Sequence, residues 1–190
     1  MDGDWLLFRR RNGTDPVTAA ITVGGRSPYY HAGMAMWING RLFCLEAKQF
    51  VGGRAVLVAN LLATDPDIAI DVRHITAKGY DRATAVGGML DITGKPYGWS
   101  SLLHATLSKV VLLRWFIRPS CDDHQNGTAP YCSMAVSRES RRAGFDPVGL
   151  LGDAWTEPGD LGRVPDALAS YVGTLSLSKG KLRMQKEEIE

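Results

Sequence analysis

The residue best suited to covalent chemistry is Cys132, which follows Pro130 and Tyr131 and opens a segment that reads as a helix to about Ala143. Free backbone N–H groups and the helix dipole at such a position stabilise an anion and lower the pKa of a thiol. A neighbouring imidazole would hold the thiolate as an ion pair. The backbone N–H of Cys132 could also stabilise the oxyanion of a tetrahedral intermediate. The alternative is a small buried side chain that only fills space.

A base for this thiol is offered by a predicted β-hairpin. Asn39 and Gly40 separate two strand-like runs, as in a two-residue hairpin loop, and this register places Gly33 opposite Glu46. Since side chains alternate between faces, His31 and Glu46 share one face as diagonal neighbours, roughly 7–8 Å apart at the backbone. The carboxylate could orient the imidazole and fix its tautomer, which makes His31 a general base. A purely structural His–Glu pair is the alternative.

The other two cysteines are weaker candidates. Cys44 alternates within an apolar strand and is expected to be packed. Cys121 lies in "SCDDHQNG", where a single Cys-x-x-His with no second pair is poor evidence for zinc, so neither a metal nor a cofactor is expected. A Cys121–Cys132 disulfide would disable the nucleophile. An odd number of cysteines and an N-terminus that begins acidic and has only a short apolar run predict a reducing compartment, with the chain cytoplasmic as synthesised. A bacterial or phage-particle protein is the corresponding expectation for its source.

Composition narrows the function classes. The chain has 190 residues, of which 45% are hydrophobic, which suits one globular domain with a substantial core. Because 22 basic residues nearly balance 20 acidic ones, nucleic acid is not an expected partner. No membrane span is expected, since the most apolar stretch, Leu102–Ile117, is interrupted by charged residues.

The pattern of elements predicts an α+β fold. Strands are expected over Gly3–Arg10, the hairpin, Arg54–Leu61 and Ile68–Ile75, and helices over Lys78–Gly94, Ser100–Ile117 and Cys132–Ala143. The stretch "VTAAITV" could add a strand, and "EPGDL" suggests a loop. A single domain is assigned to residues 1–177. The charged residues 178–190 are predicted to be a frayed tail or a docking segment for a protein partner.

The order of short motifs carries a family resemblance. The succession "GDWLLF", "SPYYHAGM", "FCLEA", "GKPYGW", "YCSMAV", "PGDL" resembles the circularly permuted NlpC-type papain-fold proteins, in the YiiX-like branch, over about residues 3–161. The resemblance implies a papain-like fold in which an antiparallel sheet presents the histidine to the helix of the cysteine. It also implies that Cys132 is the nucleophile, that His31 is the general base and that Glu46 orients His31. Substrate contacts are expected from Tyr97, Tyr30 and Ser133.

The resulting functional hypothesis is a cofactor-free cysteine hydrolase that cleaves amide bonds in peptidoglycan peptides through an acyl-enzyme. A second hypothesis keeps the Cys–His–Glu triad but takes a lipid acyl group as substrate, as in a lipid acyl hydrolase or acyltransferase. A third is a non-catalytic structural or assembly module, of the kind found in phage particles, with the basic tail as its docking segment.

Overall fold

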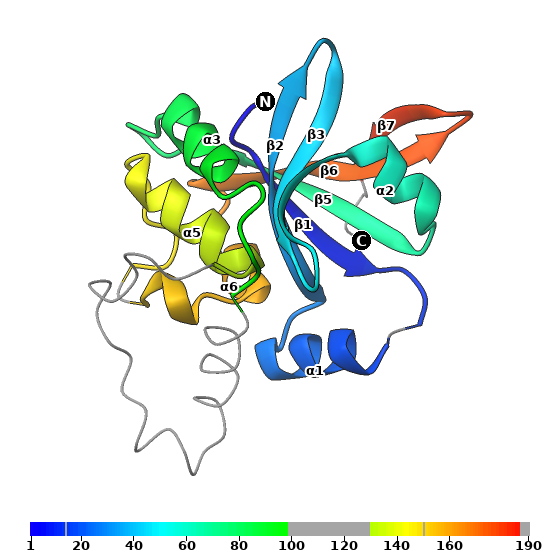
Figure 1. Cartoon of the computed structure of the whole chain (residues 1–190), viewed down its shortest axis with the longest axis horizontal. Helices are drawn as coiled ribbons and strands as arrows, with labels where there is room; N and C mark the ends of the chain where they lie inside the picture. Colours follow the sequence, from blue (N-terminus) through cyan, green and yellow to red (C-terminus); the bar gives the residue numbers. More distant parts are fainter. Residues whose placement is uncertain (14, 99–129, 150, 187–190) are drawn as a thin grey trace.

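The computed structural model describes residues 1–13, 15–98, 130–149 and 151–186, and its centre is an antiparallel sheet of seven strands in the order β4-β3-β2-β1-β5-β6-β7 (Figure 1). The α+β class is therefore confirmed. The strands are Trp5–Arg10 (β1), Tyr29–Ile38 (β2), Arg41–Lys48 (β3), Gly52–Leu57 (β4), Ile68–Ile75 (β5), Ala169–Ser178 (β6) and Lys181–Gln185 (β7).

The described helices cover both faces of this sheet. They are Pro16–Gly25 (α1), Val58–Thr64 (α2), Arg82–Asp91 (α3), Cys132–Arg142 (α5) and Pro158–Gly162 (α6), with a short 3-10 turn at Asp153–Trp155 (η2). Helices α3, α5 and α6 lie together on one side, at the left of Figure 1, whereas α2 lies on the other. None of these helices is long and apolar enough to cross a membrane.

Strand β1 explains why the sheet can carry a layer on each face. Its residues Trp5 to Phe8 are all buried, and their side chains alternate between two cores. Trp5 and Leu7 belong to the core against α3, α5 and α6, and Leu6 and Phe8 belong to the core that includes α2. A central strand covered on both faces reads as a continuous apolar run, as it does here.

The hairpin register predicted from the sequence is confirmed. Asn39 and Gly40 form the loop with φ values of 50° and 72°, the left-handed conformation that a two-residue hairpin loop requires. Ile38 pairs with Arg41, and Ala35 pairs with Cys44. Gly33 has no room for a side chain, because a Cβ there would collide with the sulfur of Cys44.

Several predicted elements need correction. The stretch "VTAAITV" lies in helix α1, not in a strand, because Asp15 accepts hydrogen bonds from the backbone N–H and hydroxyl of Thr18 and Pro16 occupies the first helical position. The strand expected over Arg54–Leu61 ends at Leu57 and continues as α2. "EPGDL" contains the short helix α6, which a capping box between Glu157 and Asp160 begins.

The C-terminal segment differs from a frayed tail. Lys181–Gln185 form β7, which pairs with β6 from Ser178–Lys181 to Thr174–Gln185. Its charged residues fit an exposed edge strand, where lysines discourage pairing with other chains. A docking role for this segment stays a prediction. The predicted helix Ser100–Ile117 and the Cys121 loop lie outside the described residues.

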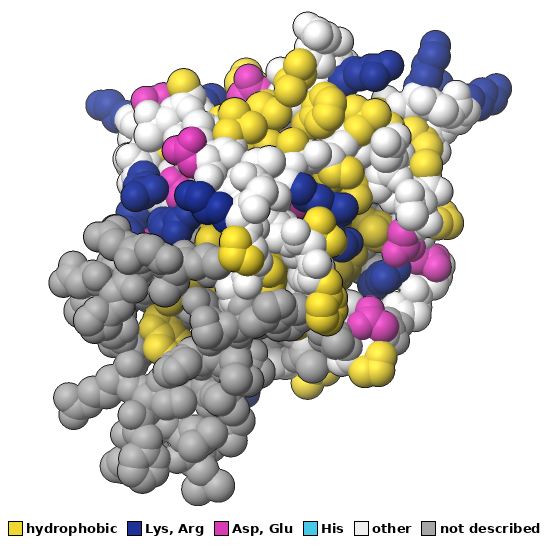
Figure 2. All heavy atoms as spheres, in the orientation of Figure 1, with side chains coloured by type: hydrophobic (Ala, Val, Ile, Leu, Met, Phe, Trp, Pro, Cys, Tyr) yellow, Lys and Arg dark blue, Asp and Glu magenta, His cyan; other side chains and the backbone are white. Residues whose placement is uncertain are grey.

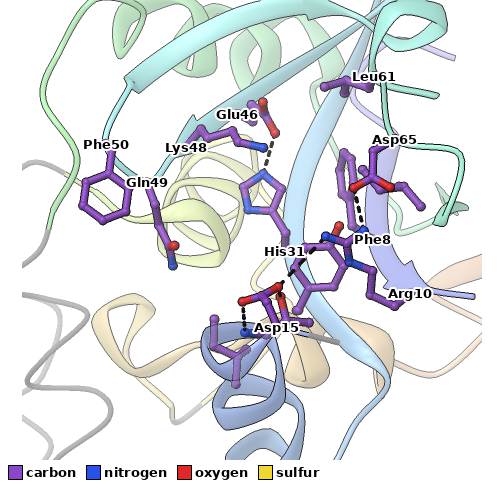
Figure 3. Close-up of a pocket in the computed structure, with 14 residues that line it drawn as sticks. Phe8, Arg10, Asp15, His31, Glu46, Lys48, Gln49, Phe50, Leu61 and Asp65 are labelled. Carbon is purple, nitrogen blue, oxygen red and sulfur yellow. Dashed lines mark hydrogen bonds and ion pairs between the residues drawn. The ribbon is translucent and has the colours of Figure 1, made fainter. Parts of the chain in front are cut away.

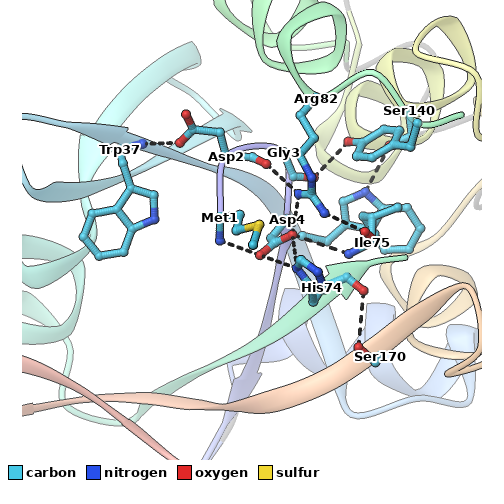
Figure 4. A network of polar contacts seen from close by, with 12 residues as sticks. Met1, Asp2, Gly3, Asp4, Trp37, His74, Ile75, Arg82, Ser140 and Ser170 are labelled. Atoms are coloured by element: carbon cyan, nitrogen blue, oxygen red, sulfur yellow. Dashed lines mark hydrogen bonds and ion pairs between the residues drawn. The ribbon is translucent and has the colours of Figure 1, made fainter. Parts of the chain in front are cut away.

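A buried carboxylate ties the start of β1 to β5 and α3 (Figure 4). Asp4 hydrogen-bonds to the N-terminal ammonium group at 2.6 Å, Nδ1 of His74 at 2.9 Å and the guanidinium of Arg82 at 2.7 Å. Burial raises the pKa of Asp4, but these hydrogen bonds outweigh burial and lower it. The network fixes α3 on the sheet, and α3 in turn packs against α5.

The outer surface shows no broad area of one charge in the view of Figure 2. Hydrophobic side chains gather over the upper part of this face, where the β2–β3 hairpin lies in Figure 1, and Lys and Arg side chains stand at its left and right borders. The hairpin tip contributes Trp37 and Ile38, which are 47% and 43% exposed.

Candidate active site

Helix α5 is held in place by polar contacts along its buried length. The hydroxyl of Ser133 donates to the carbonyl of Thr156 at 2.7 Å, and that of Ser137 donates to Asp153 at 2.6 Å. Ser140 accepts a 3.0 Å hydrogen bond from the indole of Trp5. Small polar residues let the helix approach its neighbours closely, and each hydroxyl finds a partner. The position of the first turn, which begins at Cys132, is therefore well defined.

Strands β2 and β3 supply a histidine and a carboxylate. Nε2 of His31 lies 2.5 Å from Oε2 of Glu46, and the other carboxylate oxygen accepts from Nε of Arg54 at 2.7 Å. Glu46 is only 1% exposed. Burial raises the pKa of Glu46, but the charges and hydrogen bonds of His31 and Arg54 lower it to about 2. The carboxylate is thus ionised and uses both oxygens to orient its neighbours.

An irregularity in the sheet helps to aim His31. The register between β1 and β2 shifts at Phe8 and Arg9, so that Tyr30 is left between the paired residues His31 and Tyr29. Such bulges are frequent beside active sites because they redirect a side chain. The imidazole is held edge-on by the ring of Phe8, with centroids 5.0 Å apart, and lies beside the ring of Tyr30.

The thiol of Cys132 meets this histidine. A hydrogen bond joins the two side chains, and because Nε2 is occupied by Glu46, it falls to Nδ1. The sulfur also accepts from the backbone N–H groups of Ala32 and Ser133. Burial raises the pKa of Cys132, but the charge and hydrogen bond of His31, with these N–H groups, lower it below its ordinary value of 9.0.

The pKa of His31 shifts in the opposite direction. Burial lowers the pKa of His31, but the negative charges of Cys132 and Glu46 outweigh burial and raise it to about 9. A lowered thiol pKa beside a raised imidazole pKa is the combination that favours a thiolate–imidazolium pair over two neutral groups. The two groups that the sequence placed in different elements therefore meet, with Glu46 behind the histidine.

Tyr97 also contacts Cys132. Its hydroxyl hydrogen-bonds with the side chain of Cys132, with the backbone N–H of Cys132 and with the side chain of Gln49. Burial and the negative charge of Cys132 raise the pKa of this phenol, so it stays protonated. No side chain caps the start of α5 among the described residues, which leaves its first N–H groups to the sulfur and to this hydroxyl.

The loop of Tyr97 is fastened at both ends. The N–H of Gly53 donates to the carbonyl of Lys95 at 2.9 Å, and the N–H of Gly98 donates to the carbonyl of Pro130 at 3.2 Å. Gly53 must be glycine, because a Cβ would collide with the carbonyl of Ile92. The "GKPYGW" motif thus bridges the start of β4 and the start of α5.

A cavity of about 310 Å³ opens beside the histidine (Figure 3). Tyr30, His31 and Glu46 line it, and so does Gln49. Of the predicted substrate contacts, the structure brings Tyr97 to the sulfur and Tyr30 to the cavity. It does not bring Ser133 there, since that side chain is fully buried and bonded to Thr156.

Two residues of this site are not predicted from the sequence. Arg54 pairs with Glu46 because β4 lies next to β3, where Glu46 is opposite Arg54. A charged residue at the start of a strand gives no sign of its partner until the pairing is known. Gln49 is in the turn between these strands, and nothing in its local sequence distinguishes it from a solvent-exposed turn residue.

Of the comparisons with known proteins, the one with solved structures bears on the fold. No protein-family model matches the chain, and no match was found among curated proteins. The structure is similar to the crystal structure of the metalloprotein yiiX from Escherichia coli O157:H7, DUF1105. The TM-score is 0.60 at 18% sequence identity, and the match covers 91% of this chain and 96% of that one. The fold is therefore YiiX-like, as the motif order predicted.

Proposed function

We propose that this protein is a cysteine hydrolase that cleaves an amide bond in peptidoglycan peptides, and that its fold is a circularly permuted papain-like fold of the NlpC type. The arrangement of Cys132, His31 and Glu46 carries the proposal. A lowered thiol pKa at a helix start, beside an imidazole oriented by a buried carboxylate, is the environment of a reactive cysteine. The histidine strand precedes the cysteine helix in the chain, which is the permuted order.

The proposed reaction begins with attack of the Cys132 thiolate on the substrate carbonyl carbon. The carbonyl oxygen becomes an oxyanion that the backbone N–H of Cys132 stabilises. Collapse of this intermediate breaks the C–N bond, and the His31 imidazolium gives its proton to the leaving amine. His31 then takes a proton from water, which attacks the thioester and releases a carboxylic acid. The sulfur of Cys132 leaves as a thiolate while His31 keeps the proton taken from water, which restores the ion pair.

The metal named for the similar structure does not fit the described residues of this chain. Among them, no group of three or more His, Cys, Asp and Glu side chains is placed to hold a metal ion. Cys121 and His124 lie outside the described residues. No step of the proposed reaction passes through a metal.

The direct test is incubation with purified muropeptides and identification of the products by mass spectrometry. We expect cleavage by the wild-type protein and none by Cys132→Ala, with a thermal midpoint that changes little, because only one sulfur atom is removed. Turnover of acyl esters with none of muropeptides would favour the lipid substrate. Equal cleavage by Cys132→Ala would refute the mechanism.

A further inference from the structure

The cavity beside His31 is lined by charged side chains of both signs. Its carboxylates are all engaged: Asp65 pairs with Arg10 at 2.5 Å, Asp15 caps the start of α1, and Glu46 binds His31 and Arg54. The cavity therefore has no carboxylate left for a cationic ligand.

Two cationic donors in the same cavity are not engaged in this way. The ammonium group of Lys48 has no ion-pair partner among the described residues. Nε of Arg10 is buried without a hydrogen-bond acceptor in the described part of the chain. A buried donor without an acceptor costs free energy, which an anionic or carbonyl group of a ligand would recover. The unmet capacity of the cavity is thus the charge of Lys48 and one N–H donor of Arg10, whose own charge Asp65 pairs.

The position of the cavity identifies the part of the substrate that enters it. His31 lines the cavity, whereas Cys132 does not. In acyl transfer the imidazole protonates the leaving amine, so the leaving group lies on the imidazole side of the sulfur. The acyl part must then lie on the opposite side of the sulfur. The cavity is the leaving-group side of the site.

Lys48 stands where the carboxylate of an amino acid would fall. Lys48 lies two residues beyond Glu46 on β3, so its side chain is on the same face of the strand as that of Glu46. Figure 3 shows its side chain extending beside the His31–Glu46 pair, with Arg10 on the far side of His31. In an α-amino acid the carboxylate is two bonds from the nitrogen, so a nitrogen at His31 brings the carboxylate close to Lys48.

We propose, building on the proposed function, that this cavity binds a leaving group that is an α-amino acid with a free carboxylate, and that Lys48 is the specificity-determining residue that binds it. The enzyme then releases the C-terminal residue of its peptide substrate. Arg10 Nε, deeper in the cavity, meets an acceptor on the side chain of that residue.

The test compares muropeptides that end in a free carboxylate with the same peptides amidated at the C-terminus. For the wild-type protein we expect amidation to raise KM about tenfold, the loss of one charge-assisted hydrogen bond, with little change in kcat. Lys48→Gln should reduce the preference for the free carboxylate to less than roughly twofold, and Lys48→Arg should retain it. Lys181→Gln, on the distant strand β7, is the matched control and should keep the wild-type preference.

Acylation by p-nitrophenyl acetate separates this inference from the proposed function. A burst of p-nitrophenol that disappears in Cys132→Ala supports the nucleophile whatever the leaving-group site binds. If that burst is present but free and amidated peptides are cleaved equally well, or if long-chain acyl esters are preferred, the proposal for Lys48 is overturned. Absence of the burst would instead refute the proposed function.

Discussion

Replacement of Glu46 by glutamine tests the electrostatic basis of the site. The substitution keeps the shape of the side chain but removes the negative charge behind His31. Lowering the pKa of Glu46 from 4.5 to about 2 corresponds to about 3 kcal/mol in favour of its carboxylate. His31 and Arg54 together supply this stabilisation and His31 is the larger cause, so the imidazolium should lose roughly 1–2 kcal/mol when the carboxylate is removed. The ion pair of Cys132 and His31 should therefore become about tenfold less favourable in Glu46→Gln.

The assay is the rate of Cys132 alkylation by iodoacetamide between pH 5 and 9, read by peptide mass spectrometry. At neutral pH we expect Glu46→Gln to react about tenfold more slowly than the wild type, since the thiolate is the reactive species. Cys44 is an internal reference, because burial raises its pKa and should keep it unreactive. Asp91→Asn removes the same charge from the exposed end of α3 and should leave the rate unchanged. If the profiles of Glu46→Gln and wild type superimpose, the carboxylate does not support the thiolate.

Three further predictions concern stability. Because the pKa of Glu46 in the folded protein lies below 4.5, the stability that its carboxylate contributes is present above that pH and is lost as the pH falls toward 2. The difference in unfolding free energy between wild type and Glu46→Gln should therefore shrink over this range. A constant difference in acid denaturation would contradict this. Asp4→Asn should lower the free energy of unfolding by about 2 kcal/mol, because it removes a buried carboxylate that accepts hydrogen bonds from several partly exposed groups. Exposed Asp2→Asn should change it by less than about 1 kcal/mol, and equal urea midpoints would refute this role of Asp4. Gly53→Ala should destabilise the protein and slow Cys132 alkylation, since its Cβ would displace the loop of Tyr97. The control variant Gly87→Ala, in open space on α3, should stabilise the protein by roughly 0.5–1 kcal/mol. A thermal midpoint unchanged in Gly53→Ala would show that the loop adapts.

The hairpin could be predicted because local chemistry determines it. Asn39 and Gly40 adopt left-handed conformations at little cost, and this loop fixes the register that brings His31 to Glu46. Helix α1 was misread because its β-branched residues resemble a strand, although Asp15 and Pro16 already mark a helix start. Strand β7 was misread because a charged segment at a sheet edge resembles a solvated tail.

Some residues of the site can be predicted from the sequence and others cannot. Cys132, His31 and Glu46 belong to patterns that the sequence displays, a helix start and a hairpin face. Arg54 and Gln49 enter the site only because β4 pairs with β3 and because the loop before α5 is fastened to β4. Such contacts depend on tertiary packing between segments far apart in the chain, which local patterns do not encode.

The central claim is that Cys132 is a thiolate at neutral pH because His31 stands beside it. The most direct measurement is the thiolate absorbance near 240 nm as a function of pH, taken as the difference between wild type and Cys132→Ala. We predict a difference signal that is already present at neutral pH and disappears only on acidification. A difference signal that first appears at pH 9 or above would show an ordinary thiol and would contradict the account.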